Sequence, residues 1–211
     1  MSERDEGSLF DGVRRFNQTD FIEHRELFAR VARRQDPHTL FVGCADSRVI
    51  PNLITKTLPG ELFTVRNVGN LVPFYREAEE YLATTSAIEY AVRILRIKNI
   101  VICGHSNCGG VGALFADDEA LSAVPHTRRW LSLARRVRDR VVAEGIDDPV
   151  EREWRAEQYN VVEQMNHLVT YPYVKDAFRR GELSIRGWYY VIETGEVFDY
   201  DPSKAEFVRI E

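Results

Sequence analysis

Three short apolar or β-rich runs, separated by longer segments, constrain the fold of this chain more than any other feature. The runs are HTLFVGC at 38–44, ELFTVRN at 61–67 and NIVICG at 99–104. Apolar runs of this length, bounded by turn residues, are typical of strands buried inside a sheet. Strands that alternate with helices pair in parallel through right-handed crossovers. The pattern therefore predicts an α/β fold with a mainly parallel central sheet flanked by helices.

The segments around these runs predict the helices and a closing hairpin. Apolar periodicity predicts four helices, over 77–96, 127–144, 149–169 and from Pro172 to Gly181. A shorter helix begins in CGGVGALFA, after the third strand. Residues 182–193 and 196–201, split by Thr194 and Gly195, predict a C-terminal antiparallel strand or hairpin.

The N-terminal segment predicts a helical arm. Phe and Leu recur at helical spacing over residues 9–35, which indicates one or two amphipathic helices with Asp20 as an N-cap. We expect an arm over 1–37 that lies on a partner subunit. No repeat, low-complexity tract or linker interrupts the sequence, so we expect one domain over 1–211.

Composition excludes several classes of function. Of 211 residues, 44% are hydrophobic, and the formal net charge of −5 argues against nucleic acid or an anionic membrane as the main partner. The opening MSERDEGSLF lacks a signal-peptide pattern and no apolar run has the length of a membrane span, so we expect a cytoplasmic protein. Three cysteines in such a protein favour metal binding or catalysis over a disulfide framework.

Two cysteines and a histidine follow strand ends. Cys44 ends the first run, and His105 and Cys108 come directly after the third. Ligands of open parallel sheets bind beyond the carboxyl ends of the strands, so we expect these three side chains to converge. Two thiolates and one imidazole suit tetrahedral zinc and leave a fourth position open, as catalytic zinc sites do. Cys103 lies inside the apolar run and is interpreted as structural.

Asp46 and Arg48 lie beside the predicted zinc ligand Cys44. Zinc lowers the pKa of a bound water to about 7 and so supplies hydroxide near neutral pH. Asp46 is predicted to accept a hydrogen bond from that hydroxide, and Arg48 to hold Asp46 ionised through a bidentate pair. Alternatively, Asp46 itself takes the fourth position and switches the site off.

The two motifs resemble the signatures of the β-class carbonic anhydrases. The motifs are C-x-D-x-R at Cys44–Arg48 and H-x-x-C at His105–Cys108, and four other stretches are similar in the same order: PGELF, RNVGNLVP, SAIEYAV and IVICGHSNCGG. The resemblance covers roughly residues 20–201. It implies an α/β fold, a homodimer that often pairs into a tetramer, and zinc-dependent reversible hydration of CO2 to bicarbonate and a proton.

The resemblance also implies roles for individual residues. Asp46 and Arg48 match the catalytic dyad of the family, and Cys44, His105 and Cys108 match its zinc ligands. Gln35 matches a glutamine that contacts substrate across the dimer interface, and Phe63 and Tyr90 match two aromatic residues of the substrate pocket. An apolar substrate such as CO2 fits an aromatic lining.

One departure concerns regulation. Some bacterial members bind bicarbonate at a second site built from Trp, Arg and Tyr, which drives the aspartate onto the zinc. Arg66 and Tyr190 match two of these residues, but Phe41 stands where the Trp would be. We therefore expect an open zinc position without this switch.

Two other functions compete with CO2 hydration. A hydrolase of carbonyl sulfide or carbon disulfide would use the same zinc-bound hydroxide on a linear sulfur analogue, and no sequence feature separates it. A non-enzymatic zinc module would need a closed site with four ligands, usually from paired C-x-x-C motifs, which this sequence lacks.

Overall fold

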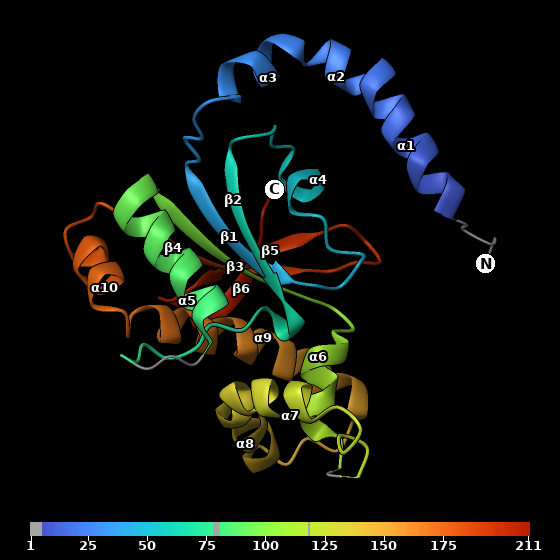
Figure 1. Cartoon of the computed structure of the whole chain (residues 1–211). Coiled ribbons are helices and arrows are strands. Elements are labelled where there is room, and N and C mark those ends of the chain that lie inside the picture. The colour runs from blue at the N-terminus through green and yellow to red at the C-terminus, as the bar shows by residue number, and fades with distance from the viewer. Residues whose placement is uncertain (1–5, 78–80, 118) are drawn as a thin grey trace.

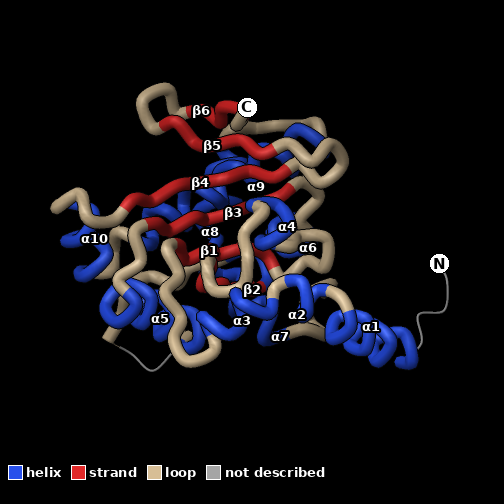
Figure 2. The backbone as a smooth tube through the Cα atoms, turned by 90° about the horizontal axis from the view of Figure 1, so that it is seen from above, coloured by secondary structure: helices blue, strands red, loops and turns tan. Residues whose placement is uncertain are grey.

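A six-stranded sheet forms the centre of the molecule. The computed structural model describes residues 6–77, 81–117 and 119–211. The strands are β1 (Thr39–Cys44), β2 (Leu62–Asn67), β3 (Asn99–His105), β4 (Ser184–Tyr190), β5 (Val197–Asp201) and β6 (Glu206–Arg209). They lie in the order β2-β1-β3-β4-β5-β6; β2, β1, β3 and β4 pair in parallel, and β5 and β6 pair antiparallel at one edge (Figure 2). The predicted mainly parallel sheet with a C-terminal hairpin is confirmed.

Strands β1 and β3 are the buried strands of the sheet. Every residue of β1 is buried, because β2 and β3 pair with its two edges and other elements cover both faces. Side chains alternate between two apolar clusters, as the pleat requires. Leu40 and Val42 face the larger cluster, and Phe41 faces a smaller one with Val101 and Cys103.

Helices surround the sheet, with the longest one packed directly on it. The helices after the arm are α4 (Pro51–Thr55), α5 (Leu82–Glu89), α6 (Gly109–Gly112), α7 (Pro125–Leu131), α8 (Arg135–Ala143), α9 (Pro149–Leu168) and α10 (Pro172–Arg179). Helix α9 lies against β3 and β4. The two elements approach each other closely: a Cβ added at Gly104 of β3 would lie only 2.6 Å from Val161 Cγ2 of α9. The absence of a side chain at Gly104 therefore allows α9 to pack this closely on β3.

The N-terminal arm lies away from the sheet. It consists of α1 (Glu6–Gln18), α2 (Asp20–Glu23) and α3 (Arg25–Val31), which arch away from the rest of the chain in Figure 1. The prediction of one or two helices is corrected to three. Asp20 is the first residue of α2 rather than its N-cap, and the Thr19 hydroxyl donates to the Arg15 carbonyl at that break.

Three other elements differ from the predictions. The segment 127–144 is two helices joined by a 3-10 turn at Ser132–Ala134. Of the predicted helix 77–96, residues 78–80 lie outside the described ranges, α5 covers 82–89, and Tyr90–Leu95 form a π-helical turn. The strand β6 was missed, because it is short, pairs on one side only and buries little apolar surface. Within the described residues, no helix combines the length and apolar composition needed to cross a membrane.

Candidate metal centre

The ends of β1 and β3 bring the three predicted metal ligands together. Gly43 pairs with Cys103, so the carboxyl ends of β1 and β3 lie side by side. Cys44 is the last residue of β1, and His105 is the last residue of β3. Cys108 follows in the turn before α6. The ligand atoms of Cys44, His105 and Cys108 lie within 4.8 Å of one another, and all three residues are buried.

The triplet fits a zinc ion. His105 Nδ1 lies 3.0 Å from the Ser106 carbonyl oxygen, so an N–H at that position donates there and leaves the Nε2 lone pair available. His105 Nε2 is buried and has no hydrogen-bond partner among the described residues. An orphaned imidazole nitrogen beside two thiols is the donor set that zinc prefers. Within the described residues, no carboxylate joins the group.

The thiols of Cys44 and Cys108 interact directly with each other. Their sulfur atoms are 3.9 Å apart. The hydrogen bond from Cys108 is the largest effect that lowers the pKa of Cys44 to about 4, and the backbone N–H groups of Asp46 and Gly69 act in the same direction. The same hydrogen bond, together with burial, raises the pKa of Cys108. A metal ion bound by both sulfurs would displace the thiol protons.

His105 responds to the same charges, whereas Cys103 does not belong to the group. Burial disfavours the imidazolium form of His105, but the charge on the Cys44 thiolate beside it outweighs burial and raises the pKa of His105. Burial raises the pKa of Cys103 to about 12, so this residue remains a thiol within the core.

The carboxylate of Asp46 faces Arg48. Asp46 Oδ1 accepts from Arg48 Nε at 2.9 Å, and Asp46 Oδ2 accepts from Arg48 Nη2 at 2.7 Å. These hydrogen bonds hold the pKa of Asp46 well below its usual range. Arg48 Nη2 also donates to the Asn107 carbonyl at 2.9 Å. The guanidinium therefore orients Asp46 and joins the loops that follow β1 and β3.

Arg66 of β2 holds the other side of the loop that follows β1. Its Nε donates to the Cys44 carbonyl at 2.9 Å and its Nη2 to the Asp46 carbonyl at 2.6 Å. From the sequence, Arg66 was matched only to a second bicarbonate site. Phe41, which replaces the Trp of that site, is buried and meets Trp188 edge to face at 6.3 Å between ring centroids. In this chain Arg66 is engaged with the backbone of the candidate metal loop.

The predicted substrate residues lie apart from the triplet within one chain. Phe63 pairs with Leu40, which is four residues before Cys44 and hence about 13 Å along the strand. The ring centroids of Phe63 and Tyr90 are 6.0 Å apart, and Gln35 and Tyr90 line the same cavity. These three residues form a group near the amino-terminal ends of the parallel strands. A single chain does not bring this group to its own metal centre.

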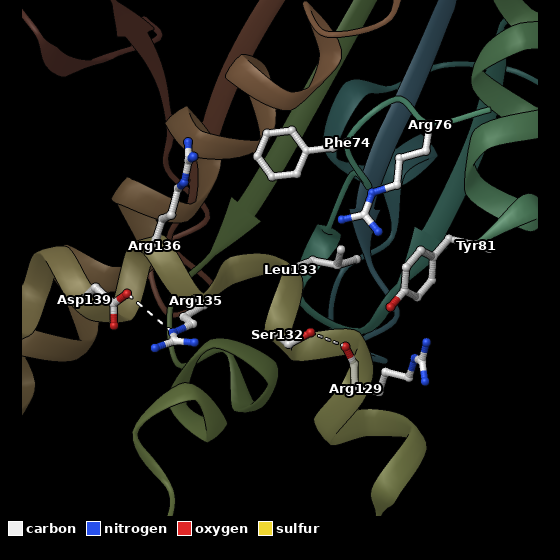
Figure 3. A pocket seen from close by; sticks show the side chains of 9 residues that line it. All are labelled: Phe74, Arg76, Tyr81, Arg129, Ser132, Leu133, Arg135, Arg136 and Asp139. Atoms are coloured by element: carbon white, nitrogen blue, oxygen red, sulfur yellow. Dashed lines mark hydrogen bonds and ion pairs between the residues drawn. The ribbon is translucent and has the colours of Figure 1, made fainter. Parts of the chain in front are cut away.

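A second cavity is basic and separate from the triplet. Figure 3 shows this cavity of about 520 Å³, which is lined by Phe74, Arg76, Tyr81, Arg129, Ser132, Leu133, Arg135, Arg136 and Asp139. Its arginines have partners: Arg135 lies 3.6 Å from Asp139, Arg136 lies 4.0 Å from Glu163, and Arg76 and Arg129 also make contacts. The lining contains none of the candidate ligands.

Comparison with known proteins identifies close relatives. Residues 39–197 match the family model described as carbonic anhydrase. The chain is 35% identical to a carbonic anhydrase of Helicobacter pylori (strain J99) over 206 residues, which is 96% of this chain and 93% of the relative. It is 37% identical to carbonic anhydrase 1 of Escherichia coli O157:H7 over 202 residues, which is 96% of this chain and 91% of the relative.

Solved structures have the same fold. The β-carbonic anhydrase CcaA superposes with a TM-score of 0.92 at 36% identity, over 97% of this chain and 98% of that one. A Coccomyxa β-carbonic anhydrase in complex with acetazolamide gives a TM-score of 0.80 at 35% identity, over 92% and 85%. One of two tetrameric β-carbonic anhydrases from Sordaria macrospora gives 0.80 at 29% identity, over 92% and 95%.

Substitution of the triplet is expected to abolish metal binding. Cys44→Ser and His105→Ala each remove one of three ligands, so the purified variants should contain almost no zinc, whereas the unsubstituted chain should contain one zinc per chain. Cys103→Ala is the matched control, because it removes a buried thiol that is not in the triplet. Elemental analysis of the dialysed proteins measures the ratio. Full zinc content in Cys44→Ser would contradict the assignment.

Proposed function

This chain belongs to the β-class carbonic anhydrases, and on that premise we propose that it hydrates CO2 reversibly at one zinc ion held by Cys44, His105 and Cys108. The observation that carries the proposal is the buried Cys2His triplet with the Asp46–Arg48 pair beside it. Three ligands leave one coordination position for substrate chemistry.

The chemistry divides between the metal and the residues around it. When bound, zinc supplies a water molecule that is acidic enough to react near neutral pH. Asp46 accepts a hydrogen bond from the reacting oxygen and thereby orients it toward CO2. The lowered pKa of Asp46 keeps it ionised, so it acts as an acceptor rather than as a store for the proton. Arg48 keeps the carboxylate turned away from the metal through its two hydrogen bonds.

The functional unit that we propose is a homodimer, which can pair into a tetramer. The arm exposes a row of apolar side chains: Leu9, Phe10, Val13, Phe16, Phe21 and Ile22. Within α2 and α3, both wholly described, no residue is buried, so the arm has little packing inside its own chain. Such a surface fits a second copy of the chain. The Sordaria relative is itself described as tetrameric.

A second copy also completes the substrate pocket. Gln35, Phe63 and Tyr90 lie together but away from the triplet of their own chain, and Tyr90 is 43% exposed. We assign this group to the site of the partner subunit, where its aromatic rings line the approach of CO2.

The proposed location is the cytoplasm, and the proposed unit is one domain over 1–211 with the arm. The location is supported by the three free cysteines, two of which must stay reduced to bind zinc.

The reaction is tested by stopped-flow CO2 hydration of Asp46→Asn. This variant should keep its zinc but lose about 100-fold to 10,000-fold in kcat/KM, because the amide cannot replace the carboxylate as a charged acceptor. Asp139→Asn, which changes another aspartate paired with an arginine, should keep the unsubstituted rate. A zinc-loaded Asp46→Asn with full activity would contradict the mechanism. Faster turnover of carbonyl sulfide than of CO2 in parallel assays would assign the site to the alternative hydrolase.

The shared pocket is tested by complementation. Cys44→Ser and Tyr90→Ala chains should each have low activity alone. A mixed dimer contains one complete site, because Cys44 comes from one chain and Tyr90 from the other. Co-expression with two affinity tags and purification of mixed dimers should therefore restore CO2 hydration above either parent. Mixed dimers without restored activity would show that each chain builds its site alone.

A further inference from the structure

Helix α9 presents a row of buried polar side chains. Charged and amide side chains are seldom fully buried unless they have partners, yet four residues on one face of α9 are at most 3% exposed: Glu157, Asn160, Gln164 and His167. Their spacing of three, four and three residues places them on one face of the helix. We call these four residues the polar row of α9.

Glu157 is bonded to the backbone of a predicted metal ligand. Its Oε1 accepts from the Cys108 N–H at 2.7 Å, and its Oε2 accepts from the Tyr189 hydroxyl at 2.7 Å. Tyr189 pairs with Gly104 in the sheet and is itself buried. Both oxygens of the carboxylate are therefore occupied, and the tyrosine fixes the orientation in which Glu157 meets Cys108.

Asn160 holds Gly69, whose backbone lies beside the Cys44 thiol. Its Nδ2 donates to the Gly69 carbonyl at 2.9 Å, and the backbone N–H of Gly69 lowers the pKa of the Cys44 thiol. Gln164 Nε2 donates to Asn160 Oδ1 at 2.9 Å, while Gln164 Oε1 accepts from the Val72 N–H at 2.8 Å. Two members of the polar row therefore hold backbone at the candidate metal centre: Glu157 holds Cys108, and Asn160 holds Gly69.

The segment that carries Cys108 has little stiffness of its own. Asn107 has φ 55°, and the two residues after Cys108 are glycines that begin the four-residue helix α6. Cys108 also sits at the N-cap of α6 without a side-chain cap, so its own backbone N–H needs an acceptor from elsewhere. Among the described residues, Glu157 supplies that acceptor.

We propose that Glu157 is a positioning residue for the metal centre: its carboxylate, oriented by Tyr189, fixes the Cys108 backbone so that the thiol faces Cys44 and His105. The inference rests on the proposed function in one respect, namely that this triplet binds zinc. Groups that orient metal ligands in this way typically change metal affinity about 10-fold to 100-fold when they are removed.

The test compares two substitutions of Glu157 with a control on the same helix. Glu157→Leu removes the acceptor at similar volume, whereas Glu157→Gln keeps it, because an amide can accept from Cys108 and donate to the Tyr189 oxygen. Glu163→Leu is the matched control: Glu163 lies on α9, and its carboxylate contacts His167 at 3.2 Å instead of the metal loop. Both leucine variants lose a partly or fully buried carboxylate.

Two readouts separate positioning from a merely structural role. One is the zinc dissociation constant from competition with a chromophoric chelator, and the other is the absorption spectrum of the cobalt-substituted protein, which reports thiolate geometry. Glu157→Leu should weaken zinc binding about 10-fold to 100-fold and shift the cobalt bands. Glu157→Gln and Glu163→Leu should retain the unsubstituted affinity and spectrum, even where Glu163→Leu lowers the melting temperature.

A further variant keeps the proposal testable if Glu157→Leu does not fold. Tyr189→Phe leaves the carboxylate in place and removes one of its two donors, so it should weaken zinc binding about 3-fold to 10-fold. Unchanged affinity and spectrum in a folded Glu157→Leu, or in Tyr189→Phe, would overturn the proposal. If Glu157→Leu weakens zinc binding but the unsubstituted, zinc-loaded protein does not hydrate CO2, the positioning role is supported and the proposed function is refuted.

Discussion

The parallel register of β1 against β3 brings two of the candidate metal ligands to one end of the sheet. Gly43 pairs with Cys103, and the carboxyl ends of the two strands, at Cys44 and His105, therefore lie side by side. A slip of one residue would turn every side chain of β1 to the opposite face. The two apolar clusters prevent such a slip, since Leu40 and Val42 fill one and Phe41 fills the other. Packing far from the metal centre thus determines which residues meet there.

The loops beyond these strand ends are held by charged and polar side chains from both flanks. Arg66 binds the loop after β1 from the β2 side, Arg48 joins that loop to the one after β3, and Glu157 holds the Cys108 segment from α9. The contact of Glu157 is buried, so the Cys108 N–H would be left without a partner or solvent if Glu157 were removed. The candidate metal centre is therefore held by residues of its own chain, and we propose that a second chain supplies the aromatic lining for the substrate.

The sequence predicts the strands and the metal ligands, but not the contacts that Glu157 and Arg66 make around them. Short apolar runs with turn residues identify β1 and β3, and strand-end cysteines and histidine predict the triplet, because both depend on local pattern and on the topology of parallel sheets. The role of Glu157 leaves no such signal: in a helix rich in charge, a buried glutamate has the same spacing as an exposed one. Its partners Cys108 and Tyr189 are 49 and 32 residues away. Arg66 was likewise visible only through a resemblance, since its contacts depend on strand pairing.

The proposed function depends on a zinc ion that is held by two sulfurs and one nitrogen and keeps its fourth position free for substrate chemistry. Zinc-edge X-ray absorption of the purified protein at neutral pH measures the number and type of atoms bound to that zinc. We predict two sulfur neighbours at about 2.3 Å and two lighter neighbours at about 2.0 to 2.2 Å, one of them an imidazole nitrogen with its characteristic outer-shell scattering. Three or four sulfur neighbours, two imidazoles, or a spectrum without sulfur would contradict it.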